Sequence, residues 1–311
     1  MHRKAGEKDK RKHNHRHHHP VNEKNLLIVT LLNLVITVAE FAGGILSNSL
    51  ALMSDALHNL SDTFATFIAY IATIIGKKTA NKQKTFGYKR IEILAALLNA
   101  VVLIVICFYL FREAYERWNN PEPINSIIML VVAMIGLLAN LYAVLILRKD
   151  AGKNLNVKAA YVHLIGDSLS SVLVIIAGVL IQFYNIYWID PIITVLIGIY
   201  IIKEAFVILK ETINILMQST PGSVNIENIK IRVEEIPEVH NLHHLHVWNL
   251  TDQEVHLEAH VELSKDMKLS EVKIIHKQIE DLLKNRFSIH HLTLQFEFNT
   301  DHPTHLVATN E

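Results

Sequence analysis

Long apolar segments limit the folds that this chain can adopt. A helix needs about 20 residues to cross the hydrocarbon core of a bilayer, and the sequence predicts six segments of that kind. They lie near residues 26–46, 50–75, 91–111, 124–147, 159–183 and 189–209. Of the 311 residues, 50% are hydrophobic and 19% are charged, which is too apolar for an ordinary water-soluble protein. We therefore expect an α-helical polytopic membrane protein with six transmembrane helices.

The rest of the chain divides into an N-terminal arm and a C-terminal domain. Residues 1–24 are basic and rich in histidine, which predicts disorder, and they lack the apolar core of a removable signal peptide. A His-rich tract can hold zinc loosely, but the surrounding lysines and arginines repel cations, so zinc capture by the arm stays open. Residues 25–210 form the membrane domain, and residues 211–311 are water-compatible and of usual domain size.

Hydrophobic periodicity predicts the elements of the C-terminal domain. They are a helix, two strands, a second helix and a third strand, at residues 225–236, 240–248, 254–263, 270–287 and 290–298. That order suggests a small α/β sandwich with one helical layer on one sheet.

The positions of the basic residues predict the orientation in the membrane. Lysine and arginine concentrate in residues 1–24, 77–90 and 148–158, whereas the connections at the opposite ends of the spans carry few. The positive-inside rule then puts both termini and the C-terminal domain in the cytoplasm. The formal net charge is zero, so nothing in the overall charge indicates a nucleic-acid partner.

Two spans carry the same pair of ionisable residues at the same spacing. His58 and Asp62 lie in the second span, and His163 and Asp167 lie in the fifth, with both residues shifted by 105 positions. Positions i and i+4 share one face of a helix, so each pair presents an imidazole and a carboxylate to a common point. Two such helices facing each other offer four ligands, the number and chemistry of a tetrahedral zinc site.

A structural interpretation competes with this one. A single pair could hydrogen-bond to a neighbouring helix, but repetition of the whole pair favours function, which is the default hypothesis for intramembrane charge. Asp55, one turn before His58, could accept a proton from a ligand, carry a proton, or be solvated at the membrane edge. The polar residues Asn33, Glu40, Asn59, Asn99 and Asn140 could line a hydrated path, although interhelical hydrogen bonds explain the asparagines at least as well.

Strand alternation in the C-terminal domain points to a second group of ligands. In residues 254–263 the apolar side chains alternate with His256, Glu258 and His260, and in residues 290–298 they alternate with Gln295 and Glu297. His260 and Glu297 can therefore meet on the polar face of the sheet. The alternative is that they are solvated surface residues.

The paired dyads, the six spans and the segment "HHLHVW" resemble the cation diffusion facilitator family, in particular its bacterial zinc and cadmium exporters. The resemblance implies a homodimeric antiporter in a membrane, expected to be the bacterial inner membrane. It exchanges Zn²⁺, cadmium or cobalt for protons and has a ferredoxin-like, metallochaperone-like cytoplasmic domain. It also implies transport ligands at His58, Asp62, His163 and Asp167, and adds His243 to the cytoplasmic zinc site.

The chain also departs from the pattern of the family that it resembles. A fourth cytoplasmic ligand is open, because Lys273 stands where some members have histidine and His276 lies one turn further on. Some members bind metal between spans two and three, but Lys84 and Tyr88 stand at those ligand positions, so we expect no such site.

Two other functions are weighed against antiport. An intramembrane metalloenzyme would need an open coordination position and a general base, and the sequence lacks a His-Glu-x-x-His motif. A passive metal channel is the second alternative, and the sequence barely separates it from an antiporter.

Cys107 is the only cysteine, which excludes an intrachain disulfide and is consistent with a packing role.

Overall fold

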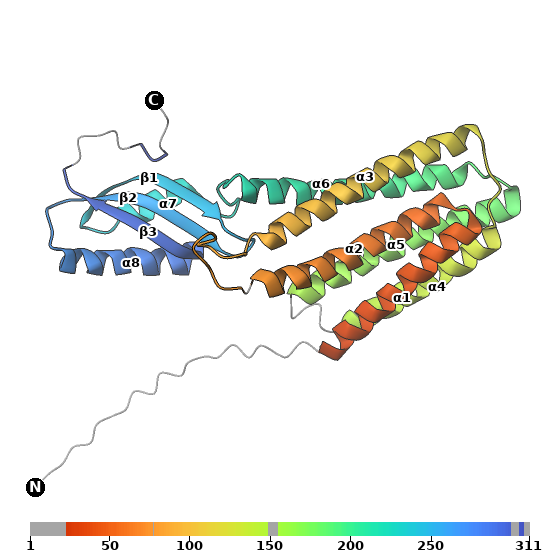
Figure 1. Ribbon diagram of the computed structural model, residues 1–311, viewed down its shortest axis with the longest axis horizontal. Helices are drawn as coiled ribbons and strands as arrows, with labels where there is room; N and C mark the ends of the chain where they lie inside the picture. The colour runs from red at the N-terminus through yellow and green to blue at the C-terminus, as the bar shows by residue number, and fades with distance from the viewer. Residues whose placement is uncertain (1–22, 77, 149–154, 300–304, 308–311) are drawn as a thin grey trace, which may run out of the picture. The chain divides into compact units, whose positions relative to one another are not determined.

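The computed structural model describes residues 23–76, 78–148, 155–299 and 305–307. Within them the chain forms six long helices and then a small α/β region (Figure 1). The long helices are α1 (Glu23–Ser47), α2 (Leu50–Gly76), α3 (Ile91–Asn119), α4 (Ser126–Leu147), α5 (Leu155–Tyr184) and α6 (Ile189–Leu216). The predictions made for residues 1–22 of the His-rich arm fall outside the described residues.

All six predicted spans correspond to helices, and several helices run further than predicted. The prediction ended the third span at residue 111, but α3 continues to Asn119. An apolar window misses this last part because it is amphipathic, with the i, i+4 ion pairs Arg112–Glu116 and Arg117–Glu113. Such pairs stabilise a helix beyond the hydrocarbon core.

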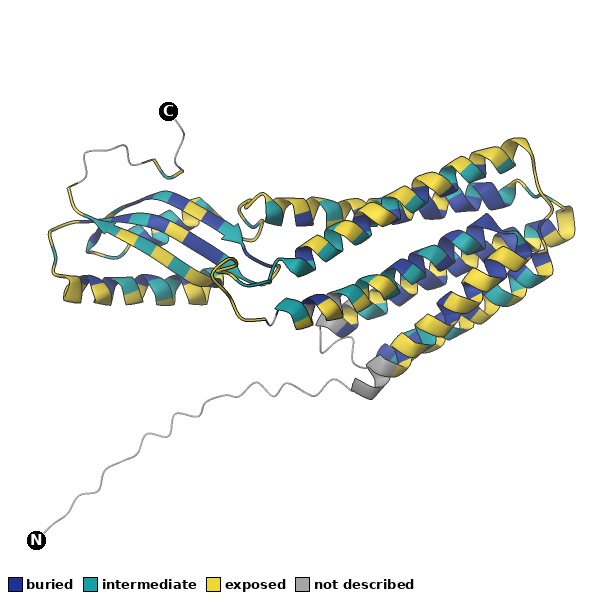
Figure 2. Cartoon of the chain, in the orientation of Figure 1, coloured by how far each residue is buried: buried dark blue, intermediate teal, exposed yellow. Residues whose placement is uncertain are grey.

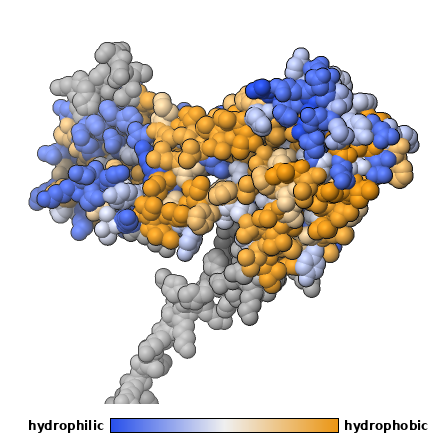
Figure 3. All heavy atoms as spheres, turned by 45° about the vertical axis from the view of Figure 1, so that its right-hand side comes forward, coloured by the Kyte–Doolittle hydropathy of each residue, from blue (hydrophilic) through white to orange (hydrophobic). Residues whose placement is uncertain are grey.

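Five of the described helices are long and apolar enough to cross a membrane. These segments are Ile28–Ser47, Ile91–Asn119, Ser126–Leu147, Ala160–Tyr184 and Ile189–Leu216. The remaining long helix, α2, has 27 residues, which is enough to span the hydrocarbon core. The dyad His58–Asp62 makes it more polar than the other five. Hydrophobic residues dominate large areas of the visible surface, and hydrophilic residues gather in separate patches (Figure 3).

The chain divides into two compact units. The first comprises residues up to Ala56 together with Pro123–Ile189, and in it α4 packs against both α1 and α5. Asn125 begins α4: its side chain accepts a hydrogen bond from the Ile128 backbone N–H at 3.2 Å, and its own N–H donates to the Ser47 carbonyl at 2.9 Å. This cap fixes the start of α4 beside the end of α1.

The second unit comprises Leu57–Glu122 and Asp190–Glu311. Its C-terminal part contains α7 (Ile226–Glu234), β1 (Val239–Asn249), β2 (Val255–Leu263), α8 (Leu269–Phe287) and β3 (Ile289–Glu297). The strands form one sheet in the order β1-β2-β3, with β1 and β2 antiparallel and β2 and β3 parallel. The predicted order of helices and strands is therefore confirmed.

One face of this sheet is covered and the other carries the polar residues. Helix α7 packs against β1 and α8 packs against β3, and Figure 2 shows buried positions along the strands. The covered face holds Leu257, Ala259 and Val261 of β2, which pack with Ile229 and Ile279 of the helices. Period-two alternation sends the intervening residues of β2 to the opposite face.

Candidate metal centres

The first dyad lies on α2 within the second unit. Its two ligand atoms, His58 Nε2 and Asp62 Oδ2, are 3.6 Å apart, and the His58 side chain is nearly buried. The acidic oxygen Glu204 Oε2 on α6 lies 3.9 Å from the same His58 nitrogen, and the Tyr200 ring meets the imidazole edge-on. Sequence reasoning missed Glu204, although an acidic residue inside a predicted span was the available signal.

The second dyad lies on α5 within the first unit and has nearly the same geometry. Here His163 Nε2 and Asp167 Oδ2 are 3.5 Å apart. The Asp167 side chain is 2% exposed and that of His163 is 36% exposed. Both dyads thus hold an imidazole nitrogen and a carboxylate oxygen on one helix face, at a separation that a shared cation could bridge.

Asp55 is buried and hydrogen-bonded. It is 1% exposed, and its carboxylate accepts hydrogen bonds from the Ser170 and Ser171 hydroxyls on α5. The interpretation of Asp55 as a solvated residue at the membrane edge is therefore wrong. It ties the start of α2 to α5, where Ser170 and Ser171 lie three and four residues after Asp167.

The C-terminal sheet brings its three predicted ligands together. Glu297 Oε1 lies 2.8 Å from His260 Nδ1, and Glu297 Oε2 lies 3.4 Å from His243 Nε2. One ligand atom from each of the three residues lies within 4.8 Å of the others. Gln295 Nε2 donates a hydrogen bond to Glu297 Oε1 at 2.6 Å, which fixes the orientation of the carboxylate.

Strand register explains this cluster. His243 on β1 pairs with His260 on β2, and Glu262, two residues on, pairs with Glu297 on β3. An irregularity between His243 and His246 breaks the β1–β2 register, and this is why simple alternation left the direction of His243 unclear.

The same irregularity positions a histidine that sequence reasoning missed. His244 has a positive φ of 50°, and its ring stacks on that of His260 with centroids 4.7 Å apart and an interplanar angle of 10°. A positive φ is unusual for a residue other than glycine, and no sequence pattern indicated it. His276 instead lies beside Phe296, outside the three-residue cluster.

The connection between α2 and α3 has a different chemistry. Lys84 Nζ lies 4.7 Å from the centroid of the Tyr88 ring, a cation–π contact. Neither residue is a usual ligand for zinc, so the expectation that this segment binds no metal stays a prediction.

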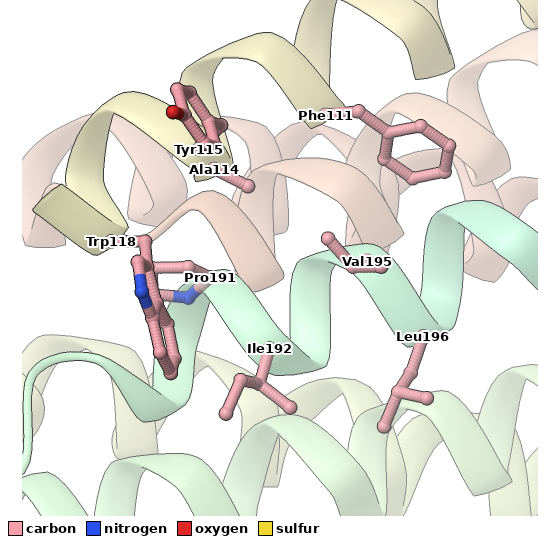
Figure 4. Close-up of a pocket in the computed structure, with 8 residues that line it drawn as sticks. All are labelled: Phe111, Ala114, Tyr115, Trp118, Pro191, Ile192, Val195 and Leu196. Atoms are coloured by element: carbon pink, nitrogen blue, oxygen red, sulfur yellow. The ribbon is translucent and has the colours of Figure 1, made fainter.

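A pocket between α3 and α6 is unsuited to a metal ion. Its volume is about 420 Å³, and Figure 4 shows the side chains that line it. Its lining residues are Phe111, Ala114, Tyr115, Trp118, Pro191, Ile192, Val195 and Leu196. The lining offers no imidazole, carboxylate or thiolate, which are the usual ligands of zinc, and is mostly apolar.

Apolar helices with repeated imidazole–carboxylate pairs, followed by a small α/β domain, define the chain as a multi-pass membrane protein built to handle metal cations. Comparison with protein families identifies it further. Residues 26–217 match the cation efflux transmembrane domain, and residues 221–298 match the cytoplasmic domain of cation efflux proteins. The chain belongs to the cation efflux family and is a transporter, not an enzyme. The resemblance to cation diffusion facilitators is confirmed.

Individual relatives cover nearly the whole chain. It is 38% identical over 285 residues to the cadmium, cobalt and zinc/H⁺-K⁺ antiporter of Bacillus subtilis, covering 91% of each chain. It is 38% identical to the metal cation efflux system protein CzcD of Cupriavidus metallidurans, covering 91% of this chain and 89% of that one. It is 36% identical to the zinc transporter ZitB of Escherichia coli, covering 90% and 89%.

Proposed function

We propose that this protein exports zinc from the cytoplasm in exchange for protons, through a tetrahedral intramembrane site formed by His58, Asp62, His163 and Asp167. Cadmium and cobalt, which the names of relatives mention, are proposed as further substrates. The observation that carries the proposal is the repetition of the dyad, with imidazole-to-carboxylate distances of 3.6 and 3.5 Å in the two helices.

The chemistry of the ligands supplies the coupling. Zinc binds ionised carboxylate and neutral imidazole, so loading the site releases any protons bound there. A free histidine titrates near pH 6.5, close to cytoplasmic pH, so protons and zinc compete for the same atoms. A site that opens alternately to the two faces then loads zinc from the cytoplasm and releases it where the more acidic outside protonates the ligands.

The cluster of His243, His260 and Glu297 has a second role in this proposal. Its two nitrogens and two oxygens fit zinc, and zinc bound there would stabilise the folded domain by linkage. We propose that this regulatory zinc supports a homodimer of cytoplasmic domains. We propose an orientation in which both termini lie in the cytoplasm. The membrane in this proposal is the bacterial inner membrane.

Substitution of the two carboxylates tests the intramembrane site. Asp62→Asn and Asp167→Asn each keep the side-chain shape but remove half of the charge that compensates the ion. We expect each variant, purified and reconstituted in lipid vesicles, to lose zinc uptake while eluting as the wild type does in size-exclusion chromatography. Glu211→Gln, at an exposed carboxylate of α6, is the matched control. Normal zinc uptake by either aspartate variant would remove the site.

A further inference from the structure

Glu40, a buried acidic residue of the membrane domain, lies outside both dyads. Glu40 on α1 is 1% exposed and belongs to the apolar segment Ile28–Ser47. An ionisable residue inside a span is costly and marks an ion or proton pathway by default. The transport dyads do not account for Glu40, because it is on a different helix from either of them.

Helix α4 leaves room for this carboxyl group. A Cβ atom added to Gly136 would collide with Glu40 Oε1, and it would lie 3.6 Å from Ile36 Cγ2. One helix turn closer to the end of α1, the roles are reversed, because Gly43 of α1 lies against the Val132 side chain of α4. Helices α1 and α4 therefore run antiparallel in close contact. Any residue other than glycine at position 136 would displace the carboxyl group.

Further polar groups line the same contact between α1 and α4. Asn140, one turn after Gly136, is 0% exposed, and neither its side-chain nitrogen nor its oxygen has a hydrogen-bond partner among the described residues. On α1, Asn33 and Thr37 continue the face of Glu40, and Asn33 Oδ1 is likewise buried without such a partner. Buried amides without hydrogen bonds are rare and need an explanation. Here the explanation is that these amides serve water or a carboxyl group that exchanges protons.

The charged groups of the surrounding helices favour a proton as the ligand. The segments Ile28–Ser47, Ser126–Leu147 and Ala160–Tyr184 contain no lysine or arginine, and α4 contains no charged residue at all. In the first turns of α2 the charged residue is Asp55, which accepts hydrogen bonds from serines of α5. Helix α5 carries Lys158 near its start, before the apolar segment Ala160–Tyr184, and His163 and Asp167 within that segment. With one carboxylate, the Thr37 hydroxyl and two side-chain amides, this contact lacks the six or more oxygens that a hard metal cation requires.

We propose that Glu40 is a proton-binding site of the transport cycle, separate from the dyads, which takes up a proton on one side of the membrane and releases it on the other. The carboxylate gains a proton from water on the acidic side and returns it to water on the cytoplasmic side, so no other bond changes. Asn33, Thr37 and Asn140 form the polar route beside it. This inference rests on the proposed proton antiport.

Removing the titratable group tests the proposal in vesicles that contain the full chain. Glu40→Gln keeps the shape and cannot ionise, so one proton fewer should cross for each zinc ion. The steady-state ratio of zinc inside to zinc outside should then fall about tenfold for each pH unit of gradient, while zinc affinity stays within about twofold. Glu40→Asp, which still titrates, should restore the dependence on the gradient. A Glu40→Gln protein with the wild-type ratio would overturn the proposal.

Two glycine variants separate the carboxyl group from helix packing. Gly136→Ala and Gly43→Ala both crowd the contact between α1 and α4, but only the first displaces Glu40. We expect Gly136→Ala to lower the number of protons per zinc ion and Gly43→Ala to leave that number unchanged. Equal effects of the two variants would assign the result to packing and would contradict the proposal.

Infrared spectroscopy observes the proton directly and does not depend on transport. The purified wild type should show a protonated-carboxyl band that decreases as the pH rises, and Glu40→Gln should lack the part of that band that belongs to this residue. If the wild type moves no protons with zinc, the proposed antiport fails, and this band still decides whether Glu40 binds a proton. A spectrum unchanged by Glu40→Gln would overturn the inference even if wild-type antiport is normal.

Discussion

Lys89 Nζ lies 2.6 Å from both carboxylate oxygens of Glu254. Lys89 precedes α3 and Glu254 precedes β2, so this ion pair joins the connection between two membrane helices to the C-terminal sheet. Beside it, the Phe86 ring meets the ring of His256 edge-on, with centroids 5.8 Å apart. Residues far apart in the sequence thus meet at one end of the sheet.

The Lys89–Glu254 pair should contribute little to stability despite its short distances. Both side chains are more than a third exposed, and exposed ion pairs contribute about 0.2–1 kcal/mol to the free energy of unfolding. We expect Lys89→Ala and Glu254→Ala each to lower that free energy by at most about 1 kcal/mol. A double-mutant cycle at low and high salt measures the coupling, which should shrink as salt rises. A coupling energy of zero at low salt would show that the contact does not form in solution.

His256 should make the stability of the domain depend on pH. Burial and the neighbouring His291 lower the pKa of His256, Lys89 and His290 lower it further, and Glu254 opposes them. The unfolded chain then binds a proton at higher pH than the folded chain does, so the free energy of unfolding falls as pH drops below about 6.5. We expect thermal unfolding of the full chain to show this fall, with a slope below about 1.4 kcal/mol per pH unit from this residue.

The variant His256→Phe isolates that contribution. It keeps an aromatic ring beside Trp248 and His291 but cannot titrate, so its stability should fall less steeply in acid than that of the wild type. His240→Gln, at an exposed histidine of β1, is the control. Parallel pH curves for His256→Phe and the wild type would contradict the assignment.

Sequence patterns predicted which residues share one face of a helix or strand, but they did not predict the contacts between elements. The dyads follow from i, i+4 spacing, and the polar face of β2 follows from alternation, because both patterns depend only on local geometry. The burial of Asp55, the approach of Glu204 to His58 and the stacking of His244 on His260 depend on tertiary contacts or on a register irregularity. No spacing rule within a single element could predict them.

Loss of the C-terminal cluster should affect transport only when zinc is scarce. The double variant His260→Ala and Glu297→Ala removes two of the three clustered side chains, so zinc should no longer stabilise the C-terminal domain of the full chain. For comparison, a ligand at 100 times its Kd stabilises a protein by about 2.7 kcal/mol. Uptake should fall at limiting zinc and reach the wild-type rate at saturating zinc.

Calorimetry and a matched control decide this prediction. The variant His240→Ala with Glu227→Ala changes the same residue types at exposed positions of the domain and should retain the zinc response. Zinc binding is measured in a chain that already carries Asp62→Asn and Asp167→Asn, so that the intramembrane site does not contribute. If adding His260→Ala and Glu297→Ala leaves zinc binding by that chain undiminished, the regulatory site is eliminated.

The central claim is that zinc and protons exchange at one intramembrane site, and zinc uptake with and without a pH gradient tests it most directly. The full chain is reconstituted in vesicles with an acidic lumen, zinc is added outside, and zinc and lumenal pH are followed together. We predict that the gradient raises zinc accumulation by about tenfold per pH unit for each coupled proton, that zinc entry makes the lumen more alkaline, and that a protonophore abolishes the accumulation. Zinc entry with the same rate and plateau in the presence and absence of the gradient would contradict antiport and would indicate a passive channel.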